Sequence, residues 1–464
     1  MSHFSTARNL KADSILEART EKIGVMEKVS FGLGDTASNF IWGMTTSYLL
    51  FFYTNVYGIS AAAVGTLFLV TRILDAISNP VMGVIVDRTK SKHGKARPYL
   101  LYLSIPLGVL SVLTFITPDL SSYSGKLIYA YVTYFLLGIC YTAVNLPYGS
   151  MLTMMTRDTN EKQKLGSYRT MGMGLGATIV AFCTLPLVDL LGNGNQRLGF
   201  PLVMAVYSIL GTFMFFLVFK NCKERYTEYK KVGEKHETGK QVMNMFKNKP
   251  WVLLAFSCLM QYLGIGAVSS IVIYYAQYVL QVPAMATVLL VVVNGGNFLG
   301  GLIASPILKR FGNRNGNLLT LGGALSSFIL LVFFGKQVIL FTILMLITYI
   351  LMGVSFAAIY AMLGDTVDYQ EWKFGKKSES LLYSSYSFAS LFGIALGSAL
   401  VGYALGWGGY DPNAITDGAR SMISIVLFTS GILFTALQIL PLLFYKLDRY
   451  HGQILSELNN RRPV

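Results

Sequence analysis

The sequence predicts an all-α membrane protein in which twelve transmembrane helices form two six-helix, pseudo-symmetric bundles. Of the 464 residues, 53% are hydrophobic and only 13% are charged, with a mean hydropathy of +0.52. Soluble chains carry about 25% charged residues, so this composition is typical of membrane proteins. Apolar runs of the roughly 20 residues that span a bilayer recur along the chain. One long polar stretch, residues 222–250, separates them into two groups of six.

Glycine, proline and clusters of charge separate the predicted spans. The spans lie near residues 30–56, 60–87, 98–118, 125–154, 165–191, 200–221, 251–280, 284–308, 316–335, 338–366, 380–407 and 420–445. The expected organisation is a cytoplasmic tail (1–28), an N-terminal bundle (29–221), a cytoplasmic linker (222–250), a C-terminal bundle (251–446) and a second cytoplasmic tail (447–464). Gly393 and Gly397, four residues apart, predict close packing of the eleventh span against another helix.

The net charge of +15 is distributed as in a membrane protein rather than a nucleic-acid-binding protein. Lys and Arg gather in alternate loops, such as 88–97 and 220–249, and are sparse in the loops between them. This positive-inside pattern predicts that both termini are cytoplasmic. The polar segment 1–28 lacks the apolar core of a cleaved signal, so we expect the first span to direct insertion. Nucleic-acid binding is not expected, and nothing in the chain requires more than a monomer.

Signatures of enzymes and of resident cofactors are missing from the sequence. It contains no HExxH, GxSxG, Walker or paired CxxC pattern, and its four histidines fall in tails or loops. We therefore expect no enzymatic activity and no cofactor.

Charged and polar side chains interrupt the second span, where lipid disfavours them. Arg72 and Asp75 are three residues apart, and Asp75, Ser78 and Asn79 lie at i, i+3 and i+4 on one helical face. Buried charges in transmembrane helices usually serve an ion or substrate path. On the fourth span, Thr142 and Asn145 are expected to face this segment and to complete a cation shell around Asp75.

A second polar group lies on the first span. Asp35, Asn39 and Trp42 are spaced to share a helical face, and an indole beside amide and carboxylate groups suits a sugar. A cluster of interhelical hydrogen bonds around a core tryptophan explains the same spacing, and both interpretations stay open. Arg169, near the start of the fifth span, is expected to pair with Asp35 or Asp75 or to meet the substrate. Snorkelling to the membrane boundary is the alternative.

Acidic residues follow the cytoplasmic end of the tenth span and open the eleventh. We expect them to pair with basic residues of the first half and so to latch the two halves together; a solvated loop is the alternative. The acidic residues are Asp365, Asp368, Glu371 and Glu379, and the basic ones are Arg88, Lys95 and Arg97.

Segments spread between about Glu27 and Arg449 carry a resemblance to a known family. They are Tyr53-Thr54-Asn55, Arg72 to Pro80, Asp87 to Pro98, Asn145-Leu146-Pro147-Tyr148-Gly149 and Asp365-Thr366-Val367-Asp368-Tyr369-Gln370-Glu371-Trp372. Together they resemble the glycoside–pentoside–hexuronide:cation symporters of the major facilitator superfamily. The resemblance implies uptake of a sugar or glycoside across the bacterial cytoplasmic membrane by alternating access, coupled to sodium or a proton.

The resemblance also implies roles for individual residues. The cation site corresponds to Asp75, Ser78, Asn79 and Thr142, and sugar contacts correspond to Asn39, Asn145, Arg169 and Phe356. The best-known family member has a second carboxylate in place of Asn79, a lysine in place of Leu391, and aspartates in place of Asn39 and Asn145. The lost anion at Asn79 and the lost cation at Leu391 are complementary, because losing either one alone would strand a buried charge. These departures put the coupling ion and the sugar in question.

Three alternatives to a cation-coupled importer remain at this point. One is an uncoupled or exchange-type sugar facilitator. Another is a non-transporting sugar sensor on the same scaffold, which would need an output domain that neither tail nor linker supplies. The third is a transporter of other solutes such as lipids, for which Asn39, Trp42, Asn145 and Arg169 are too polar. Within sugars, a uronide, a sulfosugar and a neutral pentoside all remain compatible.

Overall fold

The computed structural model describes residues 23–156, 158–226, 238–335, 337–375 and 379–461, with the backbone alone at a few helical positions. All regular structure in these ranges is helical. The first six long helices are α2 (Val25–Phe51), α3 (Ala61–Arg88), α4 (Arg97–Thr114), α5 (Tyr123–Met155), α6 (Thr159–Gly192) and α7 (Gln196–Asn221). The last six are α9 (Lys249–Tyr274), α10 (Ala284–Phe311), α11 (Asn313–Phe334), α12 (Val338–Phe374), α13 (Glu379–Trp407) and α14 (Asp417–Phe444).

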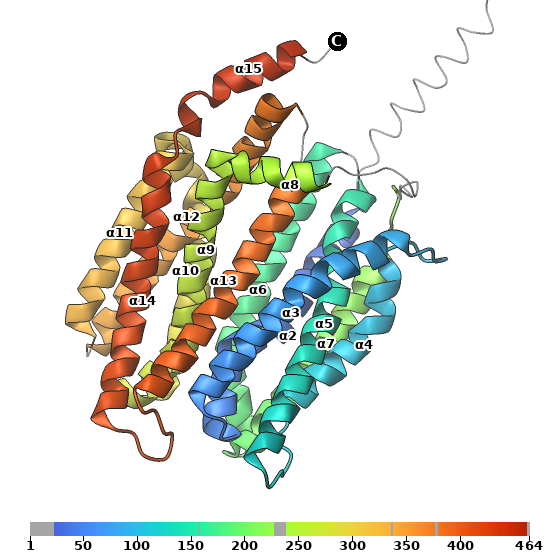
Figure 1. Cartoon of the computed structure of the whole chain (residues 1–464). Helices are drawn as coiled ribbons and strands as arrows, with labels where there is room; N and C mark the ends of the chain where they lie inside the picture. The colour runs from blue at the N-terminus through green and yellow to red at the C-terminus, as the bar shows by residue number, and fades with distance from the viewer. Residues whose placement is uncertain (1–22, 157, 227–237, 336, 376–378, 462–464) are drawn as a thin grey trace, which may run out of the picture.

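Shorter elements complete the chain. Two π-helical turns, η1 (Phe52–Val56) and η2 (Tyr275–Val279), extend α2 and α9. The 3-10 turn η3 (Leu447–Arg449) precedes α15 (His451–Arg461), and α8 (Thr238–Lys247) precedes α9. Figure 1 shows α8 and α15 at the same end of the bundle, which we call the proximal end. The opposite, distal end carries η1, η2 and the connection between α13 and α14.

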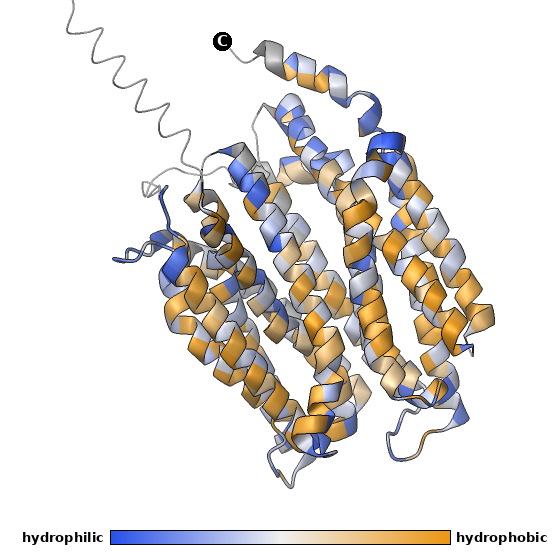
Figure 2. Cartoon of the chain, turned by 180° about the vertical axis from the view of Figure 1, so that it is seen from behind, coloured by the Kyte–Doolittle hydropathy of each residue, from blue (hydrophilic) through white to orange (hydrophobic). Residues whose placement is uncertain are grey.

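Ten of the described helices are long and apolar enough to cross a membrane. The other two long helices, α2 with 27 residues and α3 with 28, carry the polar groups noted above. The all-helical membrane fold is therefore confirmed, while the full count of twelve spans stays a prediction for α2 and α3. Figure 2 shows hydrophobic residues along the long helices and hydrophilic ones gathered towards their ends.

Helices pack closely where glycine removes the side chain. Within the first six, α2 packs on α6 and α7, and α4 packs on α5 and α7; within the last six, α9 packs on α13 and α14, and α12 on α10 and α11. A Cβ on Gly397 of α13 would overlap the carbonyl oxygen of Leu263 on α9, and one on Gly393 would lie 2.8 Å from that of Leu259. The expected close packing at these glycines is confirmed.

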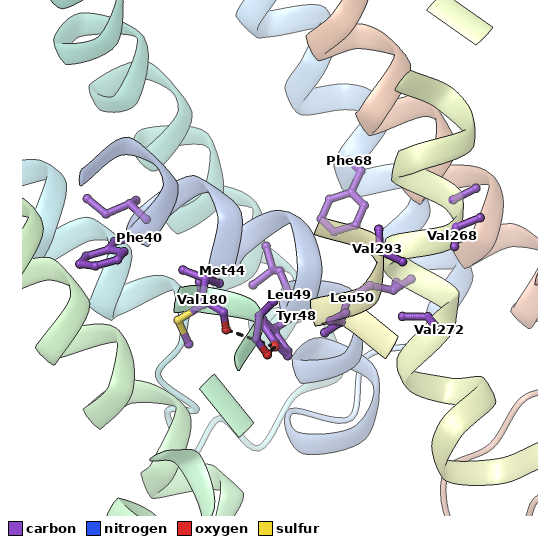
Figure 3. Packing of buried hydrophobic residues seen from close by; sticks show 14 of the residues in the cluster. Phe40, Met44, Tyr48, Leu49, Leu50, Phe68, Val180, Val268, Val272 and Val293 are labelled. Atoms are coloured by element: carbon purple, nitrogen blue, oxygen red, sulfur yellow. Dashed lines mark hydrogen bonds between the residues drawn. The ribbon is translucent and has the colours of Figure 1, made fainter. Parts of the chain in front are cut away.

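The two groups of six meet through three principal helix pairs. These are α3 with α13, α6 with α10, and α2 with α9. One continuous buried apolar cluster extends from α2 into α9 and α10, and Figure 3 shows Leu49 and Leu50 beside Val272 and Val293. The core thus crosses the boundary between the halves.

Three segments differ from the sequence-based expectation. The linker contains α8, and the second tail contains α15. The acidic segment 365–371 lies inside α12, which continues to Phe374 rather than ending near residue 366. Asn248 explains part of this, because its amide donates to Thr366 O at 3.1 Å and to Gln370 Oε1 at 2.9 Å. Its side chain also accepts from Trp251 N, so one residue begins α9 and holds α12 beside it.

Candidate functional site

An ion pair between α2 and α6 forms the centre of the candidate site. Arg169 donates from Nε to Asp35 Oδ2 at 2.7 Å and from Nη2 to Asp35 Oδ1 at 3.1 Å. The two side chains are 29% and 13% exposed. Of the partners expected for Arg169, the structure selects Asp35. A paired arginine and carboxylate satisfy each other's charge, which either alone would lack inside a membrane.

Tyr148 of α5 joins this pair from a third helix. Its hydroxyl lies 2.7 Å from Asp35 Oδ2 and also contacts Phe31 O. The guanidinium of Arg169 lies over the Tyr148 ring, 5.0 Å from its centroid. Gly34 makes room for this arrangement, because a Cβ there would overlap the Tyr148 ring. Three helices of the first half are thereby tied together at one carboxylate.

A stacked aromatic pair lies near the ion pair. The rings of Trp42 and Tyr141 are 4.4 Å apart at an interplanar angle of 21°. Asn145 donates to Tyr141 OH and to Ser38 Oγ, both at 3.0 Å. Asn145 therefore bonds to α2, and the expectation that it faces α3 stays a prediction. Asn39 donates to Asp35 O at 2.9 Å, one turn earlier on the same helix.

The facing half contributes aromatic side chains. Phe356 of α12 packs edge-on against Tyr262 of α9 at 5.3 Å, and Tyr360 packs against Tyr386 of α13 at 5.0 Å. Tyr360 is close enough to Arg169 to interact with it electrostatically. It nevertheless keeps 49% of its surface exposed. Tyr360 thus brings an aromatic side chain of the second half close to the ion pair of the first.

The predicted cation-coupling residues lie on α3 and α5. A Cβ on Gly138 of α5 would lie 2.9 Å from Asp75 Oδ1, so the carboxylate is directed at that helix. Thr142, 8% exposed, is one turn from Gly138 on the same face. Ser78 donates its hydroxyl to Asp75 O at 3.1 Å, which engages that hydroxyl with its own helix. The side chain of Asn79, like that of Arg72, lies outside the described residues.

Three of the residues expected to latch the halves, Arg97, Asp365 and Asp368, make contacts within their own half. Arg97 donates to Phe219 O at the end of α7. On the other side, His451 of α15 lies 3.1 Å from Asp368 and 3.7 Å from Asp365. The expected pairing of Arg97 with these aspartates is therefore not what this conformation contains. The latch remains a prediction for Arg88 and Glu371, and the Glu379 side chain lies outside the described residues.

Sequence reasoning missed several contributors to the site. Two of them could have been found from the sequence. Tyr148 lies in the segment Asn145 to Gly149, and Tyr141 precedes Thr142, which was already a candidate. Tyr262, Tyr360 and Tyr386 carry no sequence signal that separates them from other aromatic residues in apolar spans. Among the described residues, no group of His, Cys, Asp and Glu is arranged to hold a metal ion.

Two groups of six long helices, joined by a linker, form the architecture of the major facilitator class of transporters. The chain belongs to the MFS/sugar transport protein family, whose model matches residues 30–449. The members of this family are membrane transporters rather than enzymes, and the chain is a multi-pass membrane protein.

Individual relatives agree with this family. The chain is 35% identical to the isoprimeverose transporter of Lactiplantibacillus pentosus, over 94% of this chain and 91% of the relative. It is 33% identical to the putative glycoside/cation symporter YagG of Escherichia coli strain K12, over 91% and 90%. The solved structure of a D-xylose-proton symporter shares the fold with a TM-score of 0.61 at 16% identity, over 89% of this chain and 96% of that one.

Proposed function

We propose that this protein imports a sugar or glycoside across the bacterial cytoplasmic membrane by alternating access and cation symport. The observation that carries the proposal is the two-sided site: Asp35, Arg169 and Asn145 supply polar groups, while Trp42 and Phe356 supply aromatic faces. Sugars need both, since hydroxyls take hydrogen bonds and the CH face stacks on rings. The printed names of two relatives, the isoprimeverose transporter and the putative glycoside/cation symporter, agree with a sugar as the substrate. The cytoplasmic position of both termini is part of this proposal.

The charge of the site favours a neutral glycoside as the substrate. Asp35 neutralises Arg169 through two hydrogen bonds, so the guanidinium is already matched before a substrate arrives. A uronide would have to compete with that carboxylate and would leave an unpaired charge in a poorly hydrated place. A neutral pentose-containing disaccharide has no such requirement. The substrate that we propose is therefore a neutral glycoside, one of the sugar classes that the sequence left open.

Cation coupling is assigned to Asp75, with Thr142 as a second oxygen on the facing helix. One carboxylate and neighbouring hydroxyl oxygens form a ligand set suited to a hard monovalent cation, and Asp75 is also the group that would carry a proton. In symport the ion and the sugar cross the membrane together. An ionised Asp75 without a bound cation would oppose this crossing.

Uptake into proteoliposomes tests the proposal. Labelled xylosyl-glucose and a labelled glucuronide are compared with and without an imposed sodium or proton gradient. We expect gradient-driven accumulation of the neutral disaccharide, and loss of accumulation with surviving exchange in Asp75→Asn. Equal entry with and without either gradient would replace symport by facilitated diffusion. Preference for the glucuronide would reverse the substrate assignment.

A further inference from the structure

The two π-helical turns occupy equivalent places in the two halves. Turn η1 follows α2, the first long helix of its half, and η2 follows α9, the first of the other. Each is followed by a residue with positive φ, Gly58 at 78° and Gln281 at 57°. π-helical turns inside helices are rare and are found frequently at functional sites. This shared backbone pattern agrees with the pseudo-symmetry expected of the two bundles.

These two turns contact each other across the halves. Asn55 of η1 donates its amide to Tyr278 OH of η2 at 2.5 Å. Tyr410, between α13 and α14, donates to Asn55 Oδ1 at 2.9 Å and lies 3.1 Å from Tyr278 OH. Thr54 and Tyr274 form a further bond of 2.7 Å. Three separate segments therefore converge at the distal end.

Side chains beneath these bonds exclude water. Thr54 is 3% exposed and Tyr274 is fully buried. Leu50, Val272 and Val293, which Figure 3 shows, belong to the same buried cluster as Tyr274. The side chains of Leu50, Val272 and Val293 are at most 1% exposed, so this layer is apolar and closed to solvent. By contrast, Tyr360 at the candidate site keeps 49% of its surface exposed.

Another hydrogen bond joins the halves near this end. Besides those above, Thr66 of α3 bonds to Tyr403 of α13 at 2.8 Å. At the proximal end, charged groups such as Arg97 and Asp368 bond within their own half. The hydrogen bonds named here between the halves thus join neutral groups at the distal end.

We propose that Asn55, Tyr278 and Tyr410 form the lock of the outer gate, with η1 and η2 as the paired segments that separate when the gate opens. The proposal rests on alternating access as the proposed function. A neutral lock suits this task, because its amide and hydroxyl groups exchange protein partners for water on opening. It strands no charge, and its strength does not depend on salt or on ion binding.

Cysteine accessibility tests the lock without using any substrate. Val272→Cys places a thiol in the apolar layer, and a membrane-impermeant maleimide is added to the outside of intact cells. The parent chain, with its four native cysteines, gives the background. In the Val272→Cys chain, Tyr278→Phe removes the bonds to Asn55 and Tyr410, and we expect the labelling rate to rise by at least about fivefold, the effect of losing one neutral hydrogen bond. Tyr410→Phe, which keeps the Asn55–Tyr278 bond, should give a smaller increase.

Tyr207→Phe is the matched control. It removes a buried tyrosine hydroxyl that bonds to Thr184 at 3.1 Å within the first half, so labelling should not change. Unchanged labelling in both Tyr278→Phe and Tyr410→Phe would overturn the lock, even if sugar uptake were normal. Faster labelling from the cytoplasmic side alone would overturn its assignment to the outer face. If the parent chain failed to take up sugar while Tyr278→Phe still labelled faster from outside, sugar import would be rejected as the function. The assignment of the gate would remain.

Discussion

Asp35 and Arg169 are joined by two hydrogen bonds, of 2.7 and 3.1 Å, between the first and fifth long helices. The helices approach closely there, since a Cβ on Gly176 of α6 would lie 2.8 Å from the Cβ of Asn39. The pair is therefore held in place by backbone packing as well as by charge. It presents to a substrate a matched, oriented dipole rather than a free cation.

Removing one member of the ion pair should lower the free energy of unfolding more than removing both members. Asp35→Asn leaves the Arg169 guanidinium without its counter-charge, and we expect a loss of about 3 kcal/mol in the free energy of unfolding. The double variant Asp35→Asn/Arg169→Gln should lose less, because no charge is stranded. Denaturation in detergent measures both. The exposed pair Arg197–Asp119, at 3.9 Å, supplies the control: Asp119→Asn should cost less than about 1 kcal/mol. Equal losses in the single and double variants would show that the charges are solvated.

Gly138 offers a way to disturb Asp75 without changing its charge. In Gly138→Ala the new methyl group would lie 2.9 Å from Asp75 Oδ1. We expect a several-fold loss of cation affinity and of sugar accumulation, with sugar exchange retained. Gly149→Ala on the same helix is the matched control, since nothing lies within 4 Å of its added Cβ. Cation-dependent uptake measures both, and equal behaviour of the two variants would remove Asp75 from coupling.

The Trp42–Tyr141 stack should contribute to sugar affinity. Trp42→Leu removes a ring stacked at 4.4 Å and the apolar face that we assign to the sugar. We expect the KM of uptake to rise about three- to tenfold with little change in maximal rate, in line with the energy of an aromatic contact. Trp407→Leu is the control for the same substitution, because Trp407 is 81% exposed and lies at the distal end of α13. A rise in KM of equal size in the control would show a general effect on folding or insertion.

Glu161 makes stability depend on pH at the proximal end. Hydrogen bonds from Lys164 at 2.8 Å and Lys28 at 2.7 Å lower the pKa of this carboxyl to about 2. Because the pKa is lowered in the folded state, the stabilisation from ionised Glu161 is complete above about pH 4.5. It is lost as the pH falls towards 2. We expect Glu161→Gln to lower the melting temperature at pH 7, with the gap to the native chain narrowing below pH 4.5. Asp417→Asn, at a fully exposed carboxylate, should show a small gap at every pH; a constant gap for Glu161→Gln would contradict the assignment.

Much of the fold was predictable because hydropathy and charge placement are local properties of the chain. The predicted second span, 60–87, and α3, Ala61–Arg88, agree within a residue at each end. Helix α15 was not predicted, because it is short and largely polar. It packs on α12, and this contact between distant segments cannot be read from the local sequence. The end of α12 was placed too early, since the acidic segment 365–371 interrupts the hydropathy without interrupting the helix.

Composition and residue spacing were enough to establish the membrane class, the helical pattern and the polar residues within apolar spans. Those features follow from composition and spacing, and each can be judged from a short stretch of chain. The tertiary structure decided which residues are partners. It placed Arg169 on Asp35 rather than Asp75, placed Asn145 on α2, and joined Asn55 to Tyr278. Such pairings depend on how distant helices pack, and packing is set by glycine contacts and side-chain shape along whole interfaces rather than by local pattern.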